Sequence, residues 1–342
     1  DDSFEWFGGN VNCKYLIAHR GWDDDFDTDF GYSGKLQFLL GVRDPEIADV
    51  SGSHGFESDN DGSGSSNQPL TSPEWWNVTL IGPLATNQTV INSNFRRAMH
   101  LRRNSQNKIN NTLMVGWPVG VLFDGTGTIN GVVNGTCYIK NSILAGYRDK
   151  SLDTTRSNGT FDPITWFQSG ANNNGRIFTT SADAQLNDAF NLNSPNALPG
   201  VNSPALTGGA TPPNDGFFDA TATYVGAFGS VNWTAGWSNF SPVTSIGDDN
   251  SAEVITSYAL GQNYPNPFNP STNIRFTLPE SANVKLSVFN TLGEKVAELV
   301  NSTMDAGVHE VNFNAAGLSS GLYIYRLEAG NVVLSRKMNL LK

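Results

Sequence analysis

The sequence predicts an all-β protein, with a right-handed parallel β-helix followed by a small antiparallel β-sandwich. Three observations support this fold class: a motif that recurs about every thirty residues, alternation of apolar and polar residues near the C-terminus, and a turn-rich composition. The chain has 35 Gly among 342 residues, and only 15% of its residues are charged, which is low for a helical cytosolic protein. A chain of this length should hold at least two domains.

The recurring motif is an apolar residue, an Asn two places later, and a short apolar run that ends in Gly. It occurs in Glu74–Gly82, Lys108–Gly116 and Tyr138–Gly146, with offsets of 34 and 30 residues between the Asn positions. Such a period predicts a solenoid, and the lack of a 3.6-residue period indicates coils of strand. Asn tolerates the left-handed backbone of a tight corner. We therefore expect the repeated asparagines to stack at one corner and to hydrogen-bond as a ladder: Asn77, Asn111 and Asn141.

Two acidic segments, 23–31 and 57–64, interrupt the predicted coils. Each places carboxylates at alternate positions beside Gly, as calcium loops do, because a hard cation takes several oxygen ligands. Neither completes an EF-hand, since the twelfth position counted from Glu57 is Gln68, and Phe30 follows the third acid of the first segment. Solvated acidic loops therefore remain the alternative. The candidate Ca²⁺ ligands are Asp25, Asp27, Asp29, Glu57, Asp59 and Asp61.

One basic cluster lies between the repeats, at 96–103. Its apolar residues alternate with basic ones, which predicts a strand with a polar outer face. It could pair with the acidic loops on the next coil, or it could form a groove for a polyanion or a carboxylate-bearing sugar. The residues concerned are Arg96, Arg97, His100, Arg102 and Arg103.

The repeat fades after the coils, which we place at 1–175. We expect a closing segment at 176–247, with a short helix at 181–190, and a polar linker at 248–262. Aromatic residues of the closing segment should cover the open end of the core, because an uncovered coil exposes strand edges and rings. A carbohydrate platform would use the same aromatic residues. They are Trp233, Trp237 and Phe240.

The final segment, 263–342, has the pattern of a small antiparallel sandwich. Three Pro within 264–270 exclude a helix or an inner strand there. Apolar residues then alternate, at Ile274, Phe276 and Leu278 and again from Val284, which predicts strands with one buried face. Turn residues divide the segment into six or seven strands. A carbohydrate-binding sandwich would show the same pattern.

These motifs, together with Gly317–Leu327 and the closing Lys337–Lys342, resemble the type A C-terminal sorting domain of the type IX secretion system of diderm bacteria. The front of the chain resembles exported bacterial β-helix proteins with this tail, and that likeness names no activity. The resemblance implies that 263–342 contacts the secretion machinery, and that the protein is secreted or anchored at the outer face of the outer membrane. The implied sorting residues are Pro265, Asn266, Pro267, Phe268, Asn269, Pro270, Gly293, Gly321, Tyr323 and Lys337.

Composition excludes several classes of partner. A net charge of -11 argues against nucleic acid and anionic lipid. No apolar run is long enough to span a bilayer.

Cys13 and Cys137 are expected to be buried thiols rather than a disulfide. Because the chain starts at Asp1 without Met or signal peptide, we expect a processed or truncated start.

Two functions remain open, because we find no nucleophile elbow, His metal motif or phosphate loop. The first is a non-enzymatic surface scaffold, adhesin or filament subunit that self-associates through the N-terminal end of the β-helix. The second is a Ca²⁺-dependent polysaccharide lyase or hydrolase of the pectate-lyase type, in which an Arg of the basic cluster takes the proton. Thr154, in Asp153-Thr-Thr155, also fits a short acceptor pattern for O-linked sugar.

Overall fold

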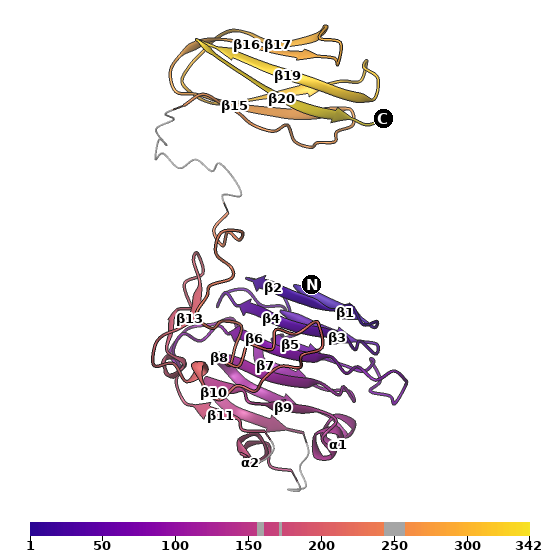
Figure 1. The fold of residues 1–342 in the computed structure, drawn as a ribbon, viewed down its shortest axis with the longest axis vertical. Helices are drawn as coiled ribbons and strands as arrows, with labels where there is room; N and C mark the ends of the chain where they lie inside the picture. The colour runs from indigo at the N-terminus through magenta and orange to yellow at the C-terminus, as the bar shows by residue number, and fades with distance from the viewer. Residues whose placement is uncertain (156–160, 171–172, 243–256) are drawn as a thin grey trace. The chain divides into compact units, whose positions relative to one another are not determined.

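The protein is described by a computed structural model that covers residues 1–155, 161–170, 173–242 and 257–342. It divides into two compact units, 1–243 and 244–342 (Figure 1). Most of the predicted linker, 248–262, lies outside the described residues. The first unit contains β1 (Phe4–Phe7), β2 (Cys13–His19), β3 (Phe26–Asp29), β4 (Lys35–Val42), β5 (Ser53–Ser58), β6 (Glu74–Ile81), β7 (Phe95–Leu101), β8 (Lys108–Phe123), α1 (Thr126–Asn134), β9 (Tyr138–Lys140), β10 (Ile143–Thr154), α2 (Pro163–Gln168), β11 (Arg176–Phe178), β12 (Leu186–Asp188) and β13 (Asn196–Pro199).

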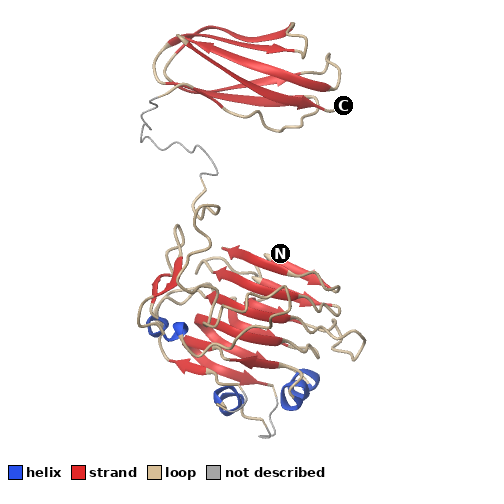
Figure 2. Cartoon of the chain, viewed as in Figure 1, coloured by secondary structure: helices blue, strands red, loops and turns tan. Residues whose placement is uncertain are grey.

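The first unit is a parallel β-helix, as the sequence predicted. Strand pairing skips alternate strands: β2 pairs with β4, β4 with β6 and β6 with β8, while β3 pairs with β5 and β5 with β7, all in parallel. The long β8 belongs to both walls, because its first part pairs with β6 and its last part with β7. Figure 2 shows the stacked strands. The bend within β8 is at Gly116 (φ 72), where an added Cβ would lie 2.3 Å from the Leu84 carbonyl oxygen.

The repeated asparagines occupy one corner of the coil. Asn77 (φ 53), Asn111 (φ 49) and Asn141 (φ 50) have left-handed backbones, and their neighbours pair in register from coil to coil. Their side-chain NH2 groups donate to carbonyl oxygens of residues 208–224 rather than to one another. Asn77 Oδ1 accepts from Gln37 Nε2 at 3.1 Å. Asn111 Nδ2 donates to the Ala210 carbonyl at 2.8 Å, and Asn111 Oδ1 accepts from the Ala210 N–H at 2.8 Å.

The other two corner residues behave alike. Asn77 Nδ2 donates to the Tyr224 carbonyl at 2.8 Å, and Asn141 Nδ2 donates to the Gly208 carbonyl at 3.0 Å. Asn77, Asn111 and Asn141 therefore stack at one corner as predicted, but they do not form the predicted ladder of hydrogen bonds between their own side chains. The backbone groups of 208–224 have no ladder partner of their own, and a buried unpaired backbone group is costly, so the amides bond to them instead.

Replacing Asn111 by Ala should lower the free energy of unfolding by about 2–4 kcal/mol. The change adds left-handed strain and leaves the Ala210 backbone groups unpaired. Asn111→Gly should cost less, because Gly relieves the strain and loses only the bonds. Denaturant titration would measure both, with the exposed Asn87→Ala as control. Equal stability of Asn111→Ala and Asn87→Ala would contradict this role.

Residues 179–242, which we call the covering segment, pack on the outside of one wall. Leu40, Ile81 and Leu113 point outward there and share an apolar cluster with Val225 and Phe228. The predicted helix at 181–190 is replaced by a 3₁₀ turn at Ser181–Ala184 followed by β12, because the segment follows the wall.

The aromatic residues of the covering segment do not close the open end of the core. Trp233 packs edge-on against Tyr15 of β2 at 5.3 Å between ring centroids, Trp237 stacks on Trp233, and Phe240 contacts His19. Helices α1 and α2 lie at the end of the stack away from β1 and β2 (Figure 1), with Ile129, Val132 and Phe167 buried in the core. These helices cover that end because their apolar side chains are adjacent to the last coils.

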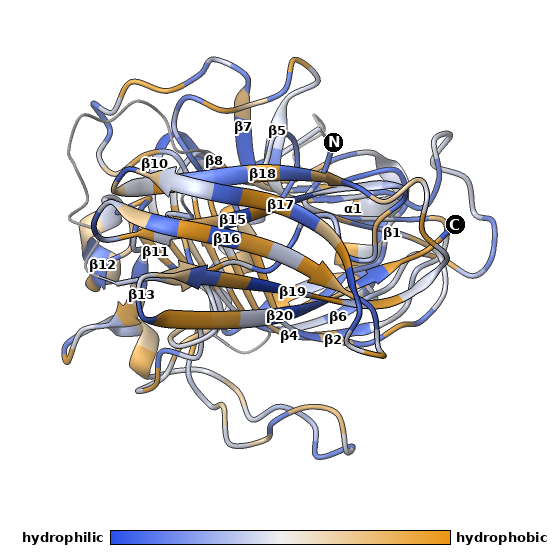
Figure 3. Cartoon of the chain, turned by 90° about the horizontal axis from the view of Figure 1, so that it is seen from above, coloured by the Kyte–Doolittle hydropathy of each residue, from blue (hydrophilic) through white to orange (hydrophobic). Residues whose placement is uncertain are grey.

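The second unit is a two-sheet antiparallel sandwich. Its strands are β14 (Ala259–Leu260), β15 (Ser271–Leu278), β16 (Ala282–Phe289), β17 (Lys295–Met304), β18 (Gly307–Asn314), β19 (Gly321–Ala329) and β20 (Val332–Leu340). They form the sheets β14-β15-β18 and β17-β16-β19-β20. Burial alternates along β19, where Tyr323, Tyr325, Leu327 and Ala329 are buried, so this strand buries one face. Figure 3 shows the hydropathy of the residues along the strands of the sandwich.

The predicted sorting residues lie in and around this sandwich. Phe268 is buried in the core beside Phe313, and its backbone N–H donates to the Asn339 carbonyl at 3.0 Å. Asn266 Oδ1 accepts from the Asn339 N–H at 2.8 Å. The Pro-rich entry segment is therefore fastened to β20. The remaining residues are Pro265, Pro267, Asn269 and Pro270 in that segment, Gly293 in the turn before β17, Gly321 and Tyr323 on β19, and Lys337 on β20.

Candidate functional site

A row of polar side chains crosses β3, β5 and β7. Phe26 of β3, Phe56 of β5 and Met99 of β7 are paired in register and buried in the core. Because side chains alternate along a strand, the following residues face outward. They are Asp27, Glu57 and His100, which are also paired in register.

The row lies in a cavity of about 260 Å³. Acidic residues from the start of the chain and from the segment before β3 line one part, and basic residues of β7 and the following turn line another. Several carboxylates and guanidinium groups therefore meet at one place on the wall. The lining residues are Asp2, Asp23, Asp24, Asp27, Ser51, Gly52, His54, Glu57, Arg96, Arg97, His100 and Arg102.

His54 is held in its neutral form. Its Nδ1 lies 3.1 Å from Asp24 Oδ1 and 3.4 Å from Glu57 Oε1, and its Nε2 lies 3.2 Å from Arg97 Nη1. Burial, followed by the charges of His100 and Arg97, lowers the pKa of His54 well below its usual value. Since an Arg can only donate, Nε2 accepts from Arg97 and Nδ1 carries the proton.

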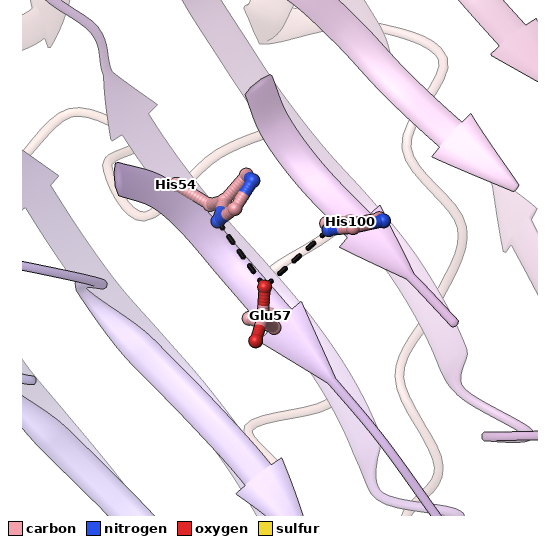
Figure 4. Close-up of side chains that lie close together, drawn as sticks. All are labelled: His54, Glu57 and His100. Atoms are coloured by element: carbon pink, nitrogen blue, oxygen red, sulfur yellow. Dashed lines mark ion pairs between the residues drawn. The ribbon is translucent and has the colours of Figure 1, made fainter. Parts of the chain in front are cut away.

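Glu57 lies between the two imidazoles, as Figure 4 shows. Its Oε1 is 3.3 Å from His100 Nδ1, and its Oε2 contacts Arg102. Arg102 also binds Asp59, with Nε 2.7 Å from Oδ1. The second nitrogen of His100, Nε2, is 3.1 Å from Asp124 Oδ2. Neighbouring side chains therefore contact both carboxylate oxygens of Glu57 and fix their orientation.

Asp27 carries a buried oxygen without a partner. Among the described residues, no group hydrogen-bonds to its Oδ1. Burial, followed by the charge of Glu57, raises the pKa of Asp27 to about 8. Asp2, Glu5 and Asp27 offer oxygens that all lie within 4.8 Å of one another, and burial raises the pKa of Asp2 and Glu5 as well. These three carboxyl groups would gain from a cation.

The six acids predicted as calcium ligands are divided among several environments. Asp27 and Glu57 line the cavity, whereas Asp25 is fully buried and bound to Arg43 at 2.8 Å. Asp29 Oδ1 accepts from the Phe30 N–H. Asp59 binds Arg102 and Arg103, and Asp61 accepts from the backbone N–H groups of Ser63 and Ser65.

The basic cluster is divided in the same way. Arg96, Arg97, His100 and Arg102 line the cavity, and Arg103 pairs with Asp59 at 2.8 Å. Sequence reasoning missed His54 and the acids Asp2, Asp23 and Asp24. Simple alternation along β5 would place residues 54 and 57 on opposite faces, so no sequence signal indicated that His54 joins Glu57 in the cavity. The register of β5 against β7 shifts just before His54, between Ser53 and His54.

Other predicted sites lie away from the cavity. Thr154 is half-buried at the end of β10, and its backbone N–H donates to Asp153 Oδ1 at 2.9 Å. Cys13 and Cys137 are free thiols, and burial raises the pKa of Cys137 to about 12. Among the described residues, none of the helices has the length and apolar character needed to cross a bilayer.

Comparison with protein families agrees with both units. Residues 1–197 match the family described as a pectate-lyase-like β-helix domain, and residues 262–340 match a secretion system C-terminal sorting domain. No curated protein and no solved structure matches the chain. The sorting domain implies a secreted or cell-surface protein that contacts the secretion machinery. Since the first match spans more than half of the 342 residues, the chain belongs to the pectate-lyase-like β-helix family, and it carries a type IX sorting domain.

Proposed function

We propose that the protein is a Ca²⁺-dependent polysaccharide lyase that works outside the cell, either free or held at the outer face of the outer membrane. The observation that supports this most is the cavity on the β3–β5–β7 wall, with the unpartnered Asp27 oxygen beside Asp2 and Glu5. An open wall of stacked strands suits an extended polymer. The sorting domain supports action outside the cell.

The cavity favours an enzyme over a scaffold. Burying ionisable groups costs free energy unless each is paired, so a scaffold gains nothing from a partly paired cluster. Active sites, in contrast, gather groups whose pKa values are shifted in opposite directions. Here the pKa of Asp27 is raised and the pKa of His54 is lowered within one cavity.

The proposed calcium site consists of Asp2, Glu5 and Asp27. Their oxygens are the hard donors that Ca²⁺ prefers, and the unpartnered Asp27 oxygen would gain a partner. When bound, Ca²⁺ would neutralise the carboxylate of an acidic sugar. It would also reduce the local negative charge of a chain whose net charge of -11 otherwise disfavours a polyanionic substrate.

Arg97 is the proposed base. It is half-buried, and burial, followed by the charge of Arg96, lowers its pKa from the usual value. In the elimination, the neutral form of the Arg97 guanidine, rather than the protonated form that donates to His54, takes the proton from the carbon next to the substrate carboxylate. The electron pair of that C–H bond forms the C=C bond, the glycosidic C–O bond breaks, and the leaving oxygen takes a proton. No oxidant or other reactant is needed.

The test is incubation with pectate, alginate and related polymers, with Ca²⁺ or with a calcium chelator. We expect unsaturated sugar products, detected by ultraviolet absorbance, only with Ca²⁺. Arg97→Gln should lower kcat by about 10²–10⁴-fold, the usual contribution of a general base. Arg148→Gln is the control, since Arg148 is exposed on β10 and lies outside the cavity.

Other outcomes would replace the proposal. Saturated products would indicate a hydrolase. Polymer binding or self-association without any product would indicate the adhesive or filament scaffold. Equal activity of Arg97→Gln and Arg148→Gln would remove Arg97 as the base.

A further inference from the structure

We propose that His54, Glu57 and His100 form a second cation site in the same cavity, for a divalent transition metal of the Zn²⁺ class. The three side chains offer ligand atoms that all lie within 4.8 Å of one another. Two imidazole nitrogens and one carboxylate oxygen form a donor set that suits Zn²⁺ and related ions, and that Ca²⁺ does not favour. The site is separate from the oxygen donors of Asp2, Glu5 and Asp27.

The spacing of the ligand atoms fits a tetrahedral ion. With metal–ligand distances of about 2.0–2.2 Å, two ligands of such an ion lie roughly 3.3–3.6 Å apart. His54 Nδ1 lies 3.4 Å from Glu57 Oε1, and His100 Nδ1 lies 3.3 Å from the same oxygen (Figure 4). The third separation, between ligand nitrogens of the two imidazoles, is within 4.8 Å.

His100 supplies an observation independent of this spacing. It is only 7% exposed, and its Nδ1 has no hydrogen-bond partner among the described residues. Its Nε2 donates to Asp124 Oδ2 at 3.1 Å, so in the neutral ring Nδ1 carries no proton and has a free lone pair. That lone pair faces a carboxylate oxygen, and two acceptors so close repel each other unless a cation lies between them.

The surroundings orient the ligands as metal sites usually require. A carboxylate bound to the far nitrogen of a ligating His fixes its tautomer, which is the position of Asp124 behind His100. Arg102 binds Glu57 Oε2 and Asp59, which leaves Glu57 Oε1 for the ion. These contacts pre-organise the carboxylate and one imidazole.

Arg97 opposes metal binding at His54. It lies 3.2 Å from His54 Nε2 and can only donate, which requires the proton to be on Nδ1. Metal binding at Nδ1 moves that proton to Nε2, so Arg97 must turn away. A side chain with an acceptor in its place should therefore favour the ion, and Arg97→Gln provides one.

The experiment is a calorimetric titration of the chelator-treated full chain with Zn²⁺, in the presence of excess Ca²⁺. We expect one Zn²⁺ per chain, and Co²⁺ in its place should give the visible absorption of a tetrahedral site. His100→Gln should weaken binding at least 100-fold, and Asp124→Asn about 10–100-fold. Arg97→Gln should tighten binding. His309→Gln, in the sandwich, is the control and should bind like the parent chain.

Binding that is unchanged in His100→Gln, or no binding to a folded chain, would overturn the proposal, and a proton shared by His100 and Glu57 would then explain the geometry. Asp124→Asn retains the shape of the side chain, so it distinguishes lost binding from lost folding. Because the readout is Zn²⁺ binding, the result does not depend on whether a polymer is cleaved.

Discussion

Replacing Arg43 by Met should lower the free energy of unfolding of the β-helix unit by about 3–5 kcal/mol. Arg43 Nη1 binds Asp25 Oδ1 at 2.8 Å, and both side chains have no exposed area. The guanidinium also lies over the Phe95 ring, 5.2 Å from its centroid. Without Arg43, the Asp25 carboxyl group must either stay ionised in the core with no opposite charge or take up a proton, and both are more costly than the loss of a surface pair.

The pH dependence gives this prediction a sign. Burial raises the pKa of Asp25 to about 6, against the lowering effect of Arg43, and loss of Arg43 should raise it further. In both chains the folded pKa of Asp25 lies above the unfolded value, so the folded chain holds the proton more tightly. The stability that Arg43→Met loses relative to the parent should therefore shrink as pH falls through the higher pKa of the variant. Thermal unfolding should show a smaller difference from the parent at about pH 5 than at about pH 8.

Two variants test the cause. Lys150→Met removes an exposed ion pair, with Asp153 at 2.9 Å and side chains 60% and 34% exposed, so the cost should be about 1 kcal/mol or less. Adding Asp25→Asn to Arg43→Met should recover part of the stability, because the buried charge is then gone. If Arg43→Met and Lys150→Met are equally stable, the buried pair contributes no more to stability than an exposed one.

Removal of residues 258–342 should abolish export of the protein. The family match assigns 262–340 to sorting, and the sandwich is a compact unit with its own core. In a bacterium with a type IX system, the parent chain should be found outside the outer membrane and the truncated chain in the periplasm. Cell fractionation with immunoblotting measures this directly.

Point substitutions test whether export requires the folded sandwich and not only the presence of the C-terminal segment. Phe268→Ala should also impair export, because it empties the core position at the Pro-rich entry and costs about 3–5 kcal/mol. Leu292→Ser, at a side chain 82% exposed, should be exported normally. A truncated chain that still reaches the medium would show that another segment carries the signal.

Regular periodicity made the architecture predictable. The Asn spacing of 34 and 30 residues marks equivalent corners, because each of these coils has one left-handed residue at the same register position. The two earlier coils were less visible, since Tyr15 (φ 59) and Phe38 (φ 61) hold the corresponding corner positions. An aromatic residue at positive φ carries no sequence signal for a turn.

The candidate site was less predictable, because it depends on how coils of unequal length align. Residues 57 and 100 are recognisable as outward positions of strands, but nothing in the sequence shows that they are neighbours. The acids near Asp2 and Asp24 join the cavity only through pairing across coils. The covering segment was misplaced for a similar reason: it has no period, and its course is set by the wall on which it packs.

The course of the covering segment has a consequence for how the β-helix unfolds. A simple solenoid is stabilised by nearest-neighbour contacts, so its terminal coils can fray independently. Here a single stretch of chain bonds to the corners at Asn77, Asn111 and Asn141, and through Trp233 it also contacts Tyr15. Releasing one coil therefore disturbs contacts with several others, which should make the loss of structure cooperative across the whole stack.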